Sequence, residues 1–131
     1  MLTISHIDHI VLTVRDIPVT LEFYARVLGM YAIQFNGKDG MKRVALTFGS
    51  QKINLHESGK EIKPSAENVI PGSVDLCLIT EIELGQAMDY VRGCNVEIID
   101  GPVERTGATG KLLSFYIRDP DLNLIEIANQ I

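Results

Sequence analysis

Five polar side chains interrupt segments that otherwise read as apolar strands. They supply two imidazoles, one amide oxygen and two carboxylates, from His9, Asn54, His56, Asp75 and Glu126. Nitrogen and oxygen donors of this kind suit a divalent metal ion such as Mn²⁺, Fe²⁺, Co²⁺, Ni²⁺ or Zn²⁺. Two carboxylates in one semi-buried cavity would repel each other, and a doubly charged cation would cancel both charges. If the fold brings these residues together, the sequence predicts a metal site.

An internal duplication offers a way to bring them together. The stretch "HIVLTV" at 9–14 aligns with "DLCLIT" at 75–80, so that His9 matches Asp75. The stretch "KINLHE" at 52–57 aligns with "LIEIAN" at 124–129 at a slightly larger offset, so that Asn54 matches Glu126. We attribute the larger offset to an extra loop, "GPVERTGATG" at 101–110. Self-similarity over half of the chain indicates a repeated supersecondary unit.

Each half is predicted to contain a strand, a short helix and three further strands. Alternating apolar residues predict the first strands at 7–14 and 74–80, and a helical pattern follows each of them. The later strands are predicted at 30–35, 42–48, 51–57, 95–100, 111–118 and 123–128. The polar, proline-bearing stretch 58–72 is interpreted as a linker. The expected fold class is therefore α+β, a single domain of residues 1–131 built from two βαβββ modules at about 5–57 and 73–129.

The predicted helices carry signals at their ends. For the first helix, Asp16 is a candidate N-cap and Gly29 stands where a left-handed residue ends a helix. Its expected buried stripe is Ile17, Leu21, Tyr24, Ala25 and Leu28. The second helix is predicted to open on a capping box of Thr80 and Glu83 and to end at Gly93. Its expected stripe is Leu84, Ala87, Met88 and Val91.

Strand alternation sorts the polar residues onto one face. Successive side chains of a strand point to opposite faces, so one parity must cover the helix. In the first strand that set is Ile10, Leu12 and Val14. The other parity holds His9, Asn54, His56, Asp75 and Glu126. Pairing of the two modules about a pseudo-two-fold axis would make the four positions that match in the duplication converge on one cavity.

The motifs "HIVLTVRD", "FYARVLGM" and "FYIRDPDLNLIEI" resemble the vicinal oxygen chelate superfamily, which includes glyoxalase I, extradiol dioxygenases and bleomycin or fosfomycin resistance proteins. The resemblance runs from about residue 5 to residue 129. Within the superfamily, "GSQKINLHESGKE" and "GPVERTGATG" look like a glyoxalase-domain group that includes a virulence-associated bacterial protein. The resemblance implies a metal-dependent active site and, often, a homodimer.

The resemblance also implies ligands position by position. The superfamily's first-strand histidine falls on His9 and its final glutamate ligand on Glu126. A ligand that is often Glu or Gln falls on Asn54, and one that is usually His falls on Asp75. The usual two-histidine, one-carboxylate triad is therefore incomplete, and His56 could restore a second imidazole by a shifted geometry. Leu122 stands where the final turn usually has glycine.

Several residues have a simpler interpretation beside the functional one. Asp75 could cap a backbone group, and Asn54 and His56 could support ligands rather than bind metal. Arg105 could close a loop on an anionic substrate group, or lie in a flexible hairpin connection. Cys77 is interpreted as a buried, inert thiol. Arg43 is interpreted as a solvated strand residue.

Composition narrows the classes of partner. The formal charge is 12 − 17 = −5 and the pI is about 5.1, which argues against nucleic acid or anionic membranes as partners. An anionic small molecule is still compatible, because a few local cations can bind one. No run of about 18 apolar residues occurs. The N-terminal stretch lacks the pattern of a signal peptide. With only two cysteines, the expected location is the cytoplasm.

Two functions fit these observations. The first is a metal-dependent enzyme acting on a small oxygenated metabolite, with glyoxalase-like lyase or isomerase chemistry preferred over dioxygenation. In that hypothesis Glu126 or Asp75 serves as a general base. The second is a metal-free protein that sequesters a small molecule, as drug-resistance members of the superfamily do. A homodimer is expected in either case.

Overall fold

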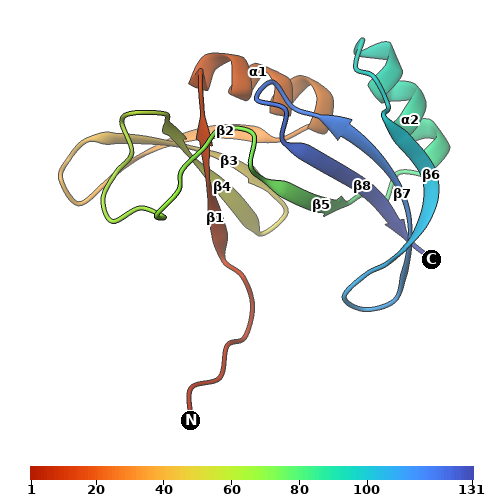
Figure 1. Cartoon of the computed structure of the whole chain (residues 1–131), viewed down its shortest axis with the longest axis horizontal. Coiled ribbons are helices and arrows are strands. Elements are labelled where there is room, and N and C mark those ends of the chain that lie inside the picture. Colours follow the sequence, from red (N-terminus) through yellow and green to blue (C-terminus); the bar gives the residue numbers. More distant parts are fainter. The chain divides into compact units, whose positions relative to one another are not determined.

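The computed structural model describes all 131 residues, which form two compact units, residues 1–71 and 72–131. Both units follow the same order of elements (Figure 1). Unit 1 contains β1 (His9–Val14), α1 (Ile17–Leu28), β2 (Tyr31–Asn36), β3 (Lys42–Phe48) and β4 (Gln51–Glu57). Unit 2 contains β5 (Asp75–Ile79), α2 (Leu84–Gly93), β6 (Asp100–Thr106), β7 (Lys111–Arg118) and β8 (Leu124–Gln130). The predicted α+β class with two βαβββ units is confirmed.

Each unit holds one four-stranded mixed sheet in which the first and last strands pair in parallel. The strand order is β1-β4-β3-β2 in unit 1 and β5-β8-β7-β6 in unit 2. The parallel register places Val11 beside Asn54, although the helix and two strands separate them in the chain. In unit 2 it places Cys77 beside Glu126 in the same way. The other neighbouring strands are antiparallel and follow one another in sequence.

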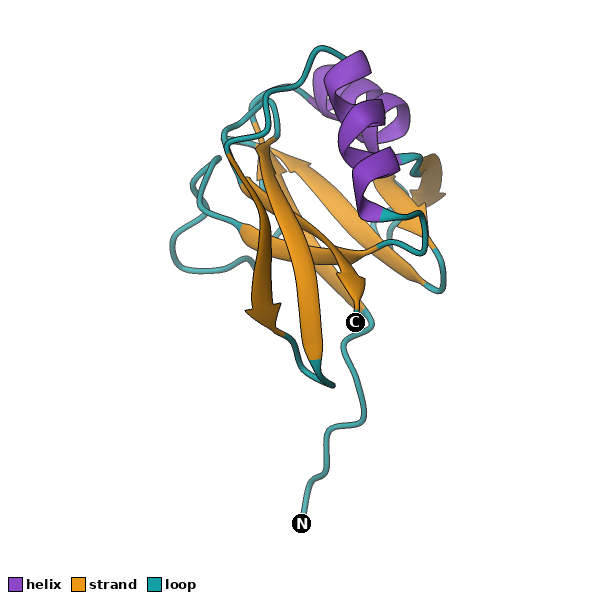
Figure 2. Ribbon diagram, turned by 90° about the vertical axis from the view of Figure 1, so that its right-hand side faces the viewer, coloured by secondary structure: helices purple, strands orange, loops and turns teal.

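In each unit the helix covers one face of the sheet (Figure 2). The buried sheet residues of unit 1 include Leu12, Val14, Leu46, Ile53 and Leu55. Those of unit 2 include Phe115, Ile117, Ile125 and Ile127. Burial of each large aliphatic side chain stabilises the fold by about 1.5–3 kcal/mol. The predicted parity of the first and last strands therefore matches the face that the structure buries.

The ends of α1 are as predicted, but its buried stripe is rotated. The Asp16 carboxylate accepts a hydrogen bond from the backbone N–H of Val19 at 2.9 Å, and Gly29 has a φ of 66°. The helix buries Thr20, Phe23, Tyr24 and Val27. Of the predicted stripe, only Tyr24 is fully buried. Both sets obey the helical repeat, so the period alone did not determine the rotation of the helix about its axis.

The start of α2 also differs from the prediction. Glu83 is itself the N-cap, and its carboxylate accepts from two backbone N–H groups of the first turn at 3.0 and 2.9 Å. Thr80 lies outside the helix, where its hydroxyl accepts from the N–H of Ile82 at 3.2 Å. The buried residues Leu84, Met88 and Val91 and the last residue, Gly93, are as predicted. Neither helix has the length and apolar composition needed to traverse a bilayer.

The first strand after α2 was predicted in the wrong place. β6 covers Asp100–Thr106 instead of 95–100, and Asn95 occupies a turn with a φ of 64°. Alternating apolar residues at 95–100 imitate a strand. However, a tight turn, closed by a 2.7 Å hydrogen bond from Gly107 N–H to the Gly110 carbonyl, pairs the residues just before it with β7. Much of the predicted 101–110 loop is therefore strand.

The turn between β7 and β8 is tied to β5 by one buried side chain. Asn123 is fully buried, and its amide oxygen accepts from the N–H of Val74 at 2.9 Å. Its amide nitrogen donates to a carboxylate oxygen of Asp119 at 2.8 Å, and its backbone N–H donates to the other at 2.9 Å. Leu122, the position that departs from glycine, has a φ of 70°. Asn123 therefore joins the two parallel strands of unit 2 where both begin.

We predict that Asn123→Ala lowers the free energy of unfolding by about 2 kcal/mol, because it removes buried hydrogen bonds to the Val74 N–H and to the Asp119 carboxylate. Urea denaturation followed by circular dichroism measures this loss. Asn36→Ala is the matched control, since Asn36 is exposed at the end of β2. Equal losses in the two variants would contradict the assigned role of Asn123.

Candidate functional site

The helix-free sheet face of unit 1, its open face, carries three of the predicted site residues. On β4 the side chains of Ile53 and Leu55 are buried, and Asn54 and His56 alternate with them on the other face. In the parallel register His9 lies beside Lys52, Val11 beside Asn54 and Thr13 beside His56. His9, Asn54 and His56 therefore share the open face of unit 1.

The His9 ring is oriented by its neighbour in the chain. Its Nδ1 lies 2.8 Å from Oδ2 of Asp8, and its side chain is 41% exposed. The hydrogen bond with His9 lowers the pKa of the Asp8 carboxyl. When Nδ1–H donates to a carboxylate, the lone pair of Nε2 is left for a metal ion, which is the usual arrangement of metal-binding histidines. Asp8 was not predicted as a site residue, because its only signal was its position directly before His9.

Of the three buried side-chain oxygens that lack a hydrogen-bond partner, two lie at matching positions of the duplication, and the third is Oγ of Ser114. The two matching atoms are Oδ1 of Asn54 in β4 and Oε2 of Glu126 in β8. An unsatisfied buried acceptor costs about 1–3 kcal/mol, so such atoms are uncommon without a reason. Both belong to side chains that were predicted as metal ligands. A bound cation would satisfy these acceptors.

The helix-free face of unit 2, its open face, carries Asp75, Cys77 and Glu126. Asp75 is exposed at the first position of β5, two residues before Cys77. The Cys77 thiol is hydrogen-bonded to the Glu126 carboxylate. Burial, followed by the charge of Glu126 and this hydrogen bond, raises the pKa of the thiol to about 11. Cys77 is exposed rather than buried as predicted, although it stays a thiol at neutral pH.

Arg105 belongs to strand β6, so its assignment to a flexible loop was wrong. Its Nε donates to the Tyr116 hydroxyl at 2.9 Å, and its Nη1 donates to the Glu104 carbonyl at 3.1 Å. The guanidinium also lies 5.6 Å from the centre of the Tyr116 ring. Tyr116 is the cross-strand neighbour of Glu126. The strand and these contacts hold the positively charged Arg105 guanidinium on the same sheet face as the Glu126 carboxylate.

His56 lies in a different setting from His9. Burial, and then the positive charge of Arg43, lower the pKa of the His56 imidazole, while Glu61 acts in the opposite direction. The ring therefore favours its neutral form, which can bind a metal ion, or donate one hydrogen bond and accept another.

Each unit thus presents part of the predicted ligand set. Unit 1 offers the His9 imidazole and the Asn54 amide oxygen, and unit 2 offers the carboxylates of Asp75 and Glu126. Neither unit by itself brings together three or more His, Cys, Asp or Glu side chains that could hold a metal ion. Convergence of the two sets stays a prediction.

Comparison with known proteins identifies the relatives of this chain. Residues 6–127 match the family described as the Glyoxalase/Bleomycin resistance protein/Dioxygenase superfamily. Virulence protein STM3117 of Salmonella typhimurium is 49% identical over 128 residues, which cover 98% of this chain and 86% of that protein. A solved structure from the mobile metagenome of V. pseudocholerae is 56% identical, with a TM-score of 0.93 and coverage of 98% of this chain and 97% of that one.

A more distant structure shares the fold alone. The fosfomycin resistance protein FosX of Listeria monocytogenes was solved as a mutant complexed with Mn(II) and a dihydroxypropylphosphonic acid. It is 22% identical to this chain, with a TM-score of 0.66 and coverage of 98% of this chain and 93% of that one.

We predict that iodoacetamide alkylates Cys77 slowly at pH 8, because a pKa of about 11 instead of 9.0 leaves about 100-fold less thiolate. Mass spectrometry of a Cys94→Ser variant follows the remaining thiol. Glu126→Gln removes the negative charge beside the sulfur, so it is expected to accelerate alkylation. Alkylation of the parent at the rate of a free cysteine would contradict the proposed contact with Glu126.

Proposed function

Because the chain belongs to the Glyoxalase/Bleomycin resistance protein/Dioxygenase superfamily and has its glyoxalase-like fold, we propose that it is a metal-dependent enzyme. The proposed chemistry is a lyase or isomerase reaction on a small oxygenated metabolite. One observation carries the proposal: Asn54 and Glu126 occupy matching places in the two units, and each buries an oxygen without a donor. Such oxygens suit a cation.

The proposed ligands are Nε2 of His9, Oδ1 of Asn54 and the carboxylates of Asp75 and Glu126. Asp8 supports the assignment of His9, because it engages the other ring nitrogen. His56 is a further candidate ligand on the same face as Asn54. This donor set fits Mn²⁺, Fe²⁺, Co²⁺, Ni²⁺ or Zn²⁺. The bound ion would supply Lewis-acid stabilisation of an oxyanion that forms on the substrate.

Glu126 is the proposed general base. One of its oxygens is unpaired, while the protonated Cys77 thiol is hydrogen-bonded to the carboxylate. That contact would restrain the carboxylate, and Glu126 would accept a proton on its other oxygen only when that oxygen is not bound to the ion. Arg105 is proposed as a substrate-binding residue, because Tyr116 holds it on the face that carries Glu126. The second carboxylate, Asp75, is exposed at the start of β5, which pairs with the strand that carries Glu126.

The alternative proposal is a metal-free protein that binds a small molecule. It is favoured by the short reach of Asn54 and by the lack of a three-ligand cluster within either unit. The superfamily's description includes bleomycin resistance proteins, so the fold supports either role. Extradiol-type dioxygenation is a further alternative, disfavoured by Asp75 at the position of a usual histidine ligand.

We predict that protein purified without chelator contains close to one divalent ion per site, measured by inductively coupled plasma mass spectrometry. His9→Ala and Glu126→Gln should lose that metal. Asp8→Asn should weaken its binding by about 10–100-fold, the usual effect of removing the partner of a ligand histidine. His6→Ala is the matched control, because His6 is exposed and bonds only to Ser5 at 2.8 Å. The binding-protein alternative would be favoured if the protein is metal-free and its thermal stability does not change when Mn²⁺, Ni²⁺ or Zn²⁺ is added.

We further propose a cytoplasmic homodimer that takes a small-molecule substrate. Neither Cys77 nor Cys94 is in a disulfide bond, which suits a reducing compartment. The chain has a mass of 14.5 kDa, so light scattering coupled to size-exclusion chromatography should report twice that mass. A species with the mass of one chain at all concentrations would contradict the dimer.

A further inference from the structure

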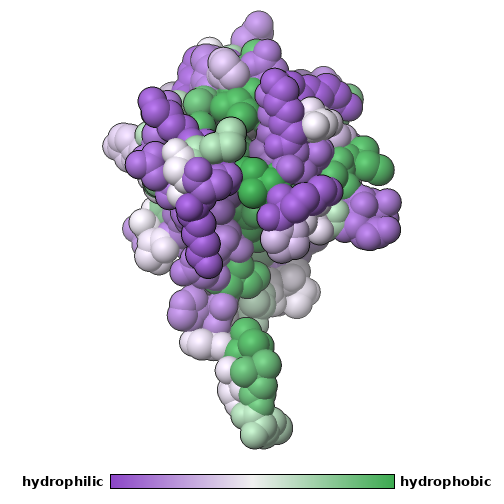
Figure 3. Space-filling model, turned by 90° about the vertical axis from the view of Figure 1, so that its left-hand side faces the viewer, coloured by the Kyte–Doolittle hydropathy of each residue, from purple (hydrophilic) through white to green (hydrophobic).

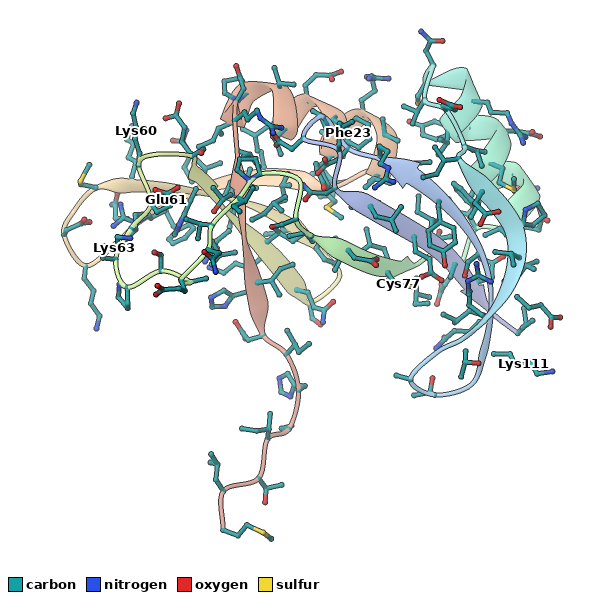
Figure 4. The ribbon with its side chains drawn as sticks, viewed as in Figure 1. Phe23, Lys60, Glu61, Lys63, Cys77 and Lys111 are labelled. Carbon is teal, nitrogen blue, oxygen red and sulfur yellow. The ribbon has the colours of Figure 1, made fainter.

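Unit 1 contains a cavity that is lined by two candidate metal ligands, Asn54 and His56, and extends beyond them. It lies beside the start of β3 and the end of β4, next to the loop that follows β4, and has a volume of about 360 Å³. Its lining includes Phe35, Asp39, Arg43, His56, Ile62 and Lys63. An adjoining hollow of about 460 Å³ shares most of these residues and extends to Lys60 and Glu61. Figure 4 shows Lys60, Glu61 and Lys63 together on that loop.

Arg43 is held in place at this cavity, contrary to its interpretation as a solvated residue. Its Nη2 lies 2.9 Å from both carboxylate oxygens of Asp39, and its side chain is only 14% exposed. Gly37 leaves room for it, because a Cβ at that position would lie 2.9 Å from the guanidinium carbon. Asp39 occupies one nitrogen of the guanidinium. Nε and Nη1 remain available to bind an anion.

The cavity carries positive charge in an acidic chain. The cations that line the two hollows are Lys38, Lys42, Arg43, Lys60 and Lys63. The anions are Asp39, Glu57 and Glu61, which gives a formal balance of 5 − 3 = +2 against −5 for the whole chain. Asp39 is paired with Arg43, and Glu57 lies 3.2 Å from Lys60. Lys63 makes no ion pair and only one hydrogen bond, to the Ser65 hydroxyl at 3.0 Å.

The remaining walls of the cavity are apolar. They come from Phe35, Val44, Leu55 and Ile62. The side of the chain seen in Figure 3 shows hydrophobic surface surrounded by hydrophilic side chains. A pocket of this size, with apolar walls and a few fixed polar groups, is typical of small-molecule sites. Cations beside apolar walls suit a small molecule that joins an oxyanion to an apolar body.

We propose that this cavity binds the oxyanion group, a carboxylate or a phosphonate or phosphate, of a small organic acid with an apolar body. Arg43 and Lys63 bind the charge, His56 donates a hydrogen bond, and Phe35 and Ile62 contact the carbon skeleton. Asn54 also lines the cavity, which links it to the proposed metal ligands. The inference rests on the proposed function in one respect, that this acid is the substrate.

The test uses the full chain and two probes, benzoate and phenylphosphonate, titrated into metal-stripped protein and followed by isothermal calorimetry and amide NMR shifts. At least one probe should bind, with shifts at residues of the cavity, and the neutral isostere benzyl alcohol should not. Stronger binding of benzoate identifies a carboxylate ligand, and stronger binding of phenylphosphonate identifies a phosphonate or phosphate. Failure of both probes to bind at millimolar concentration overturns the proposal.

Variants assign the binding to named residues. Arg43→Gln and Lys63→Gln should each lower the affinity for the probe by about tenfold, as expected for loss of a charge-assisted hydrogen bond. Lys111→Gln, which removes an exposed cation from the start of β7, should change affinity less than twofold. Lys63→Gln leaves the Arg43–Asp39 pair intact, so it stays informative if Arg43→Gln does not fold. Equal weakening by Lys63→Gln and Lys111→Gln would show nonspecific charge attraction and refute the site.

Failure of this inference is distinguishable from failure of the proposed function. Lys63→Gln should retain the metal content of the parent, whereas His9→Ala should lose metal and still bind the probe. Probe binding in a protein that never holds metal would refute the metal-dependent enzyme and keep the anion site. Bound metal without probe binding would refute the anion site and leave the metal-dependent enzyme standing.

Discussion

Parallel pairing between the first and last strands of each unit is the interaction on which the candidate site depends. It places Asn54 beside Val11 and Glu126 beside Cys77, residues that are distant in the chain. The same pairing determines which side chains meet the helix. A slip of one residue in β4 would expose Ile53 and Leu55 and turn Asn54 toward the core. Burial worth about 1.5–3 kcal/mol for each such side chain opposes that slip. The hydrophobic core therefore keeps the polar donors on the open face.

The elements and their faces were predictable where they depend on local period. Strand alternation placed His9, Asn54 and Glu126 on the helix-free face, and Asp16 and Gly29 marked the ends of α1. The helical period did not determine which side of α1 meets the sheet, because a stripe that includes Leu21 and a stripe that includes Phe23 both follow the helical repeat. The position of β6 was missed because its pairing with β7 overrides the apolar pattern before it. Local pattern could not predict a choice that only tertiary contacts make.

The surroundings of the site residues were harder to predict than the residues themselves. The Asp8 carboxylate orients the His9 ring, although Asp8 lies outside every helix and strand. Arg43 looks solvated in the sequence, but its side chain is mostly covered, pairs with Asp39 and lies against Gly37. Arg105 was found as a functional candidate, yet its strand and its contact with Tyr116 depend on the register of β6 and β7. These environments arise from packing between segments, which a single sequence does not contain.

The thiol of Cys77 has a consequence for the chemistry that the open face of unit 2 can tolerate. Hydrogen peroxide oxidises thiolates far faster than thiols. Partial burial, followed by the Glu126 charge, raises the pKa of this thiol and keeps it protonated at neutral pH, so it resists conversion to sulfenic acid. Burial and the neighbouring carboxylate therefore protect the sulfur from oxidative damage, and the chain keeps a cysteine on its proposed working surface without making that surface a redox sensor.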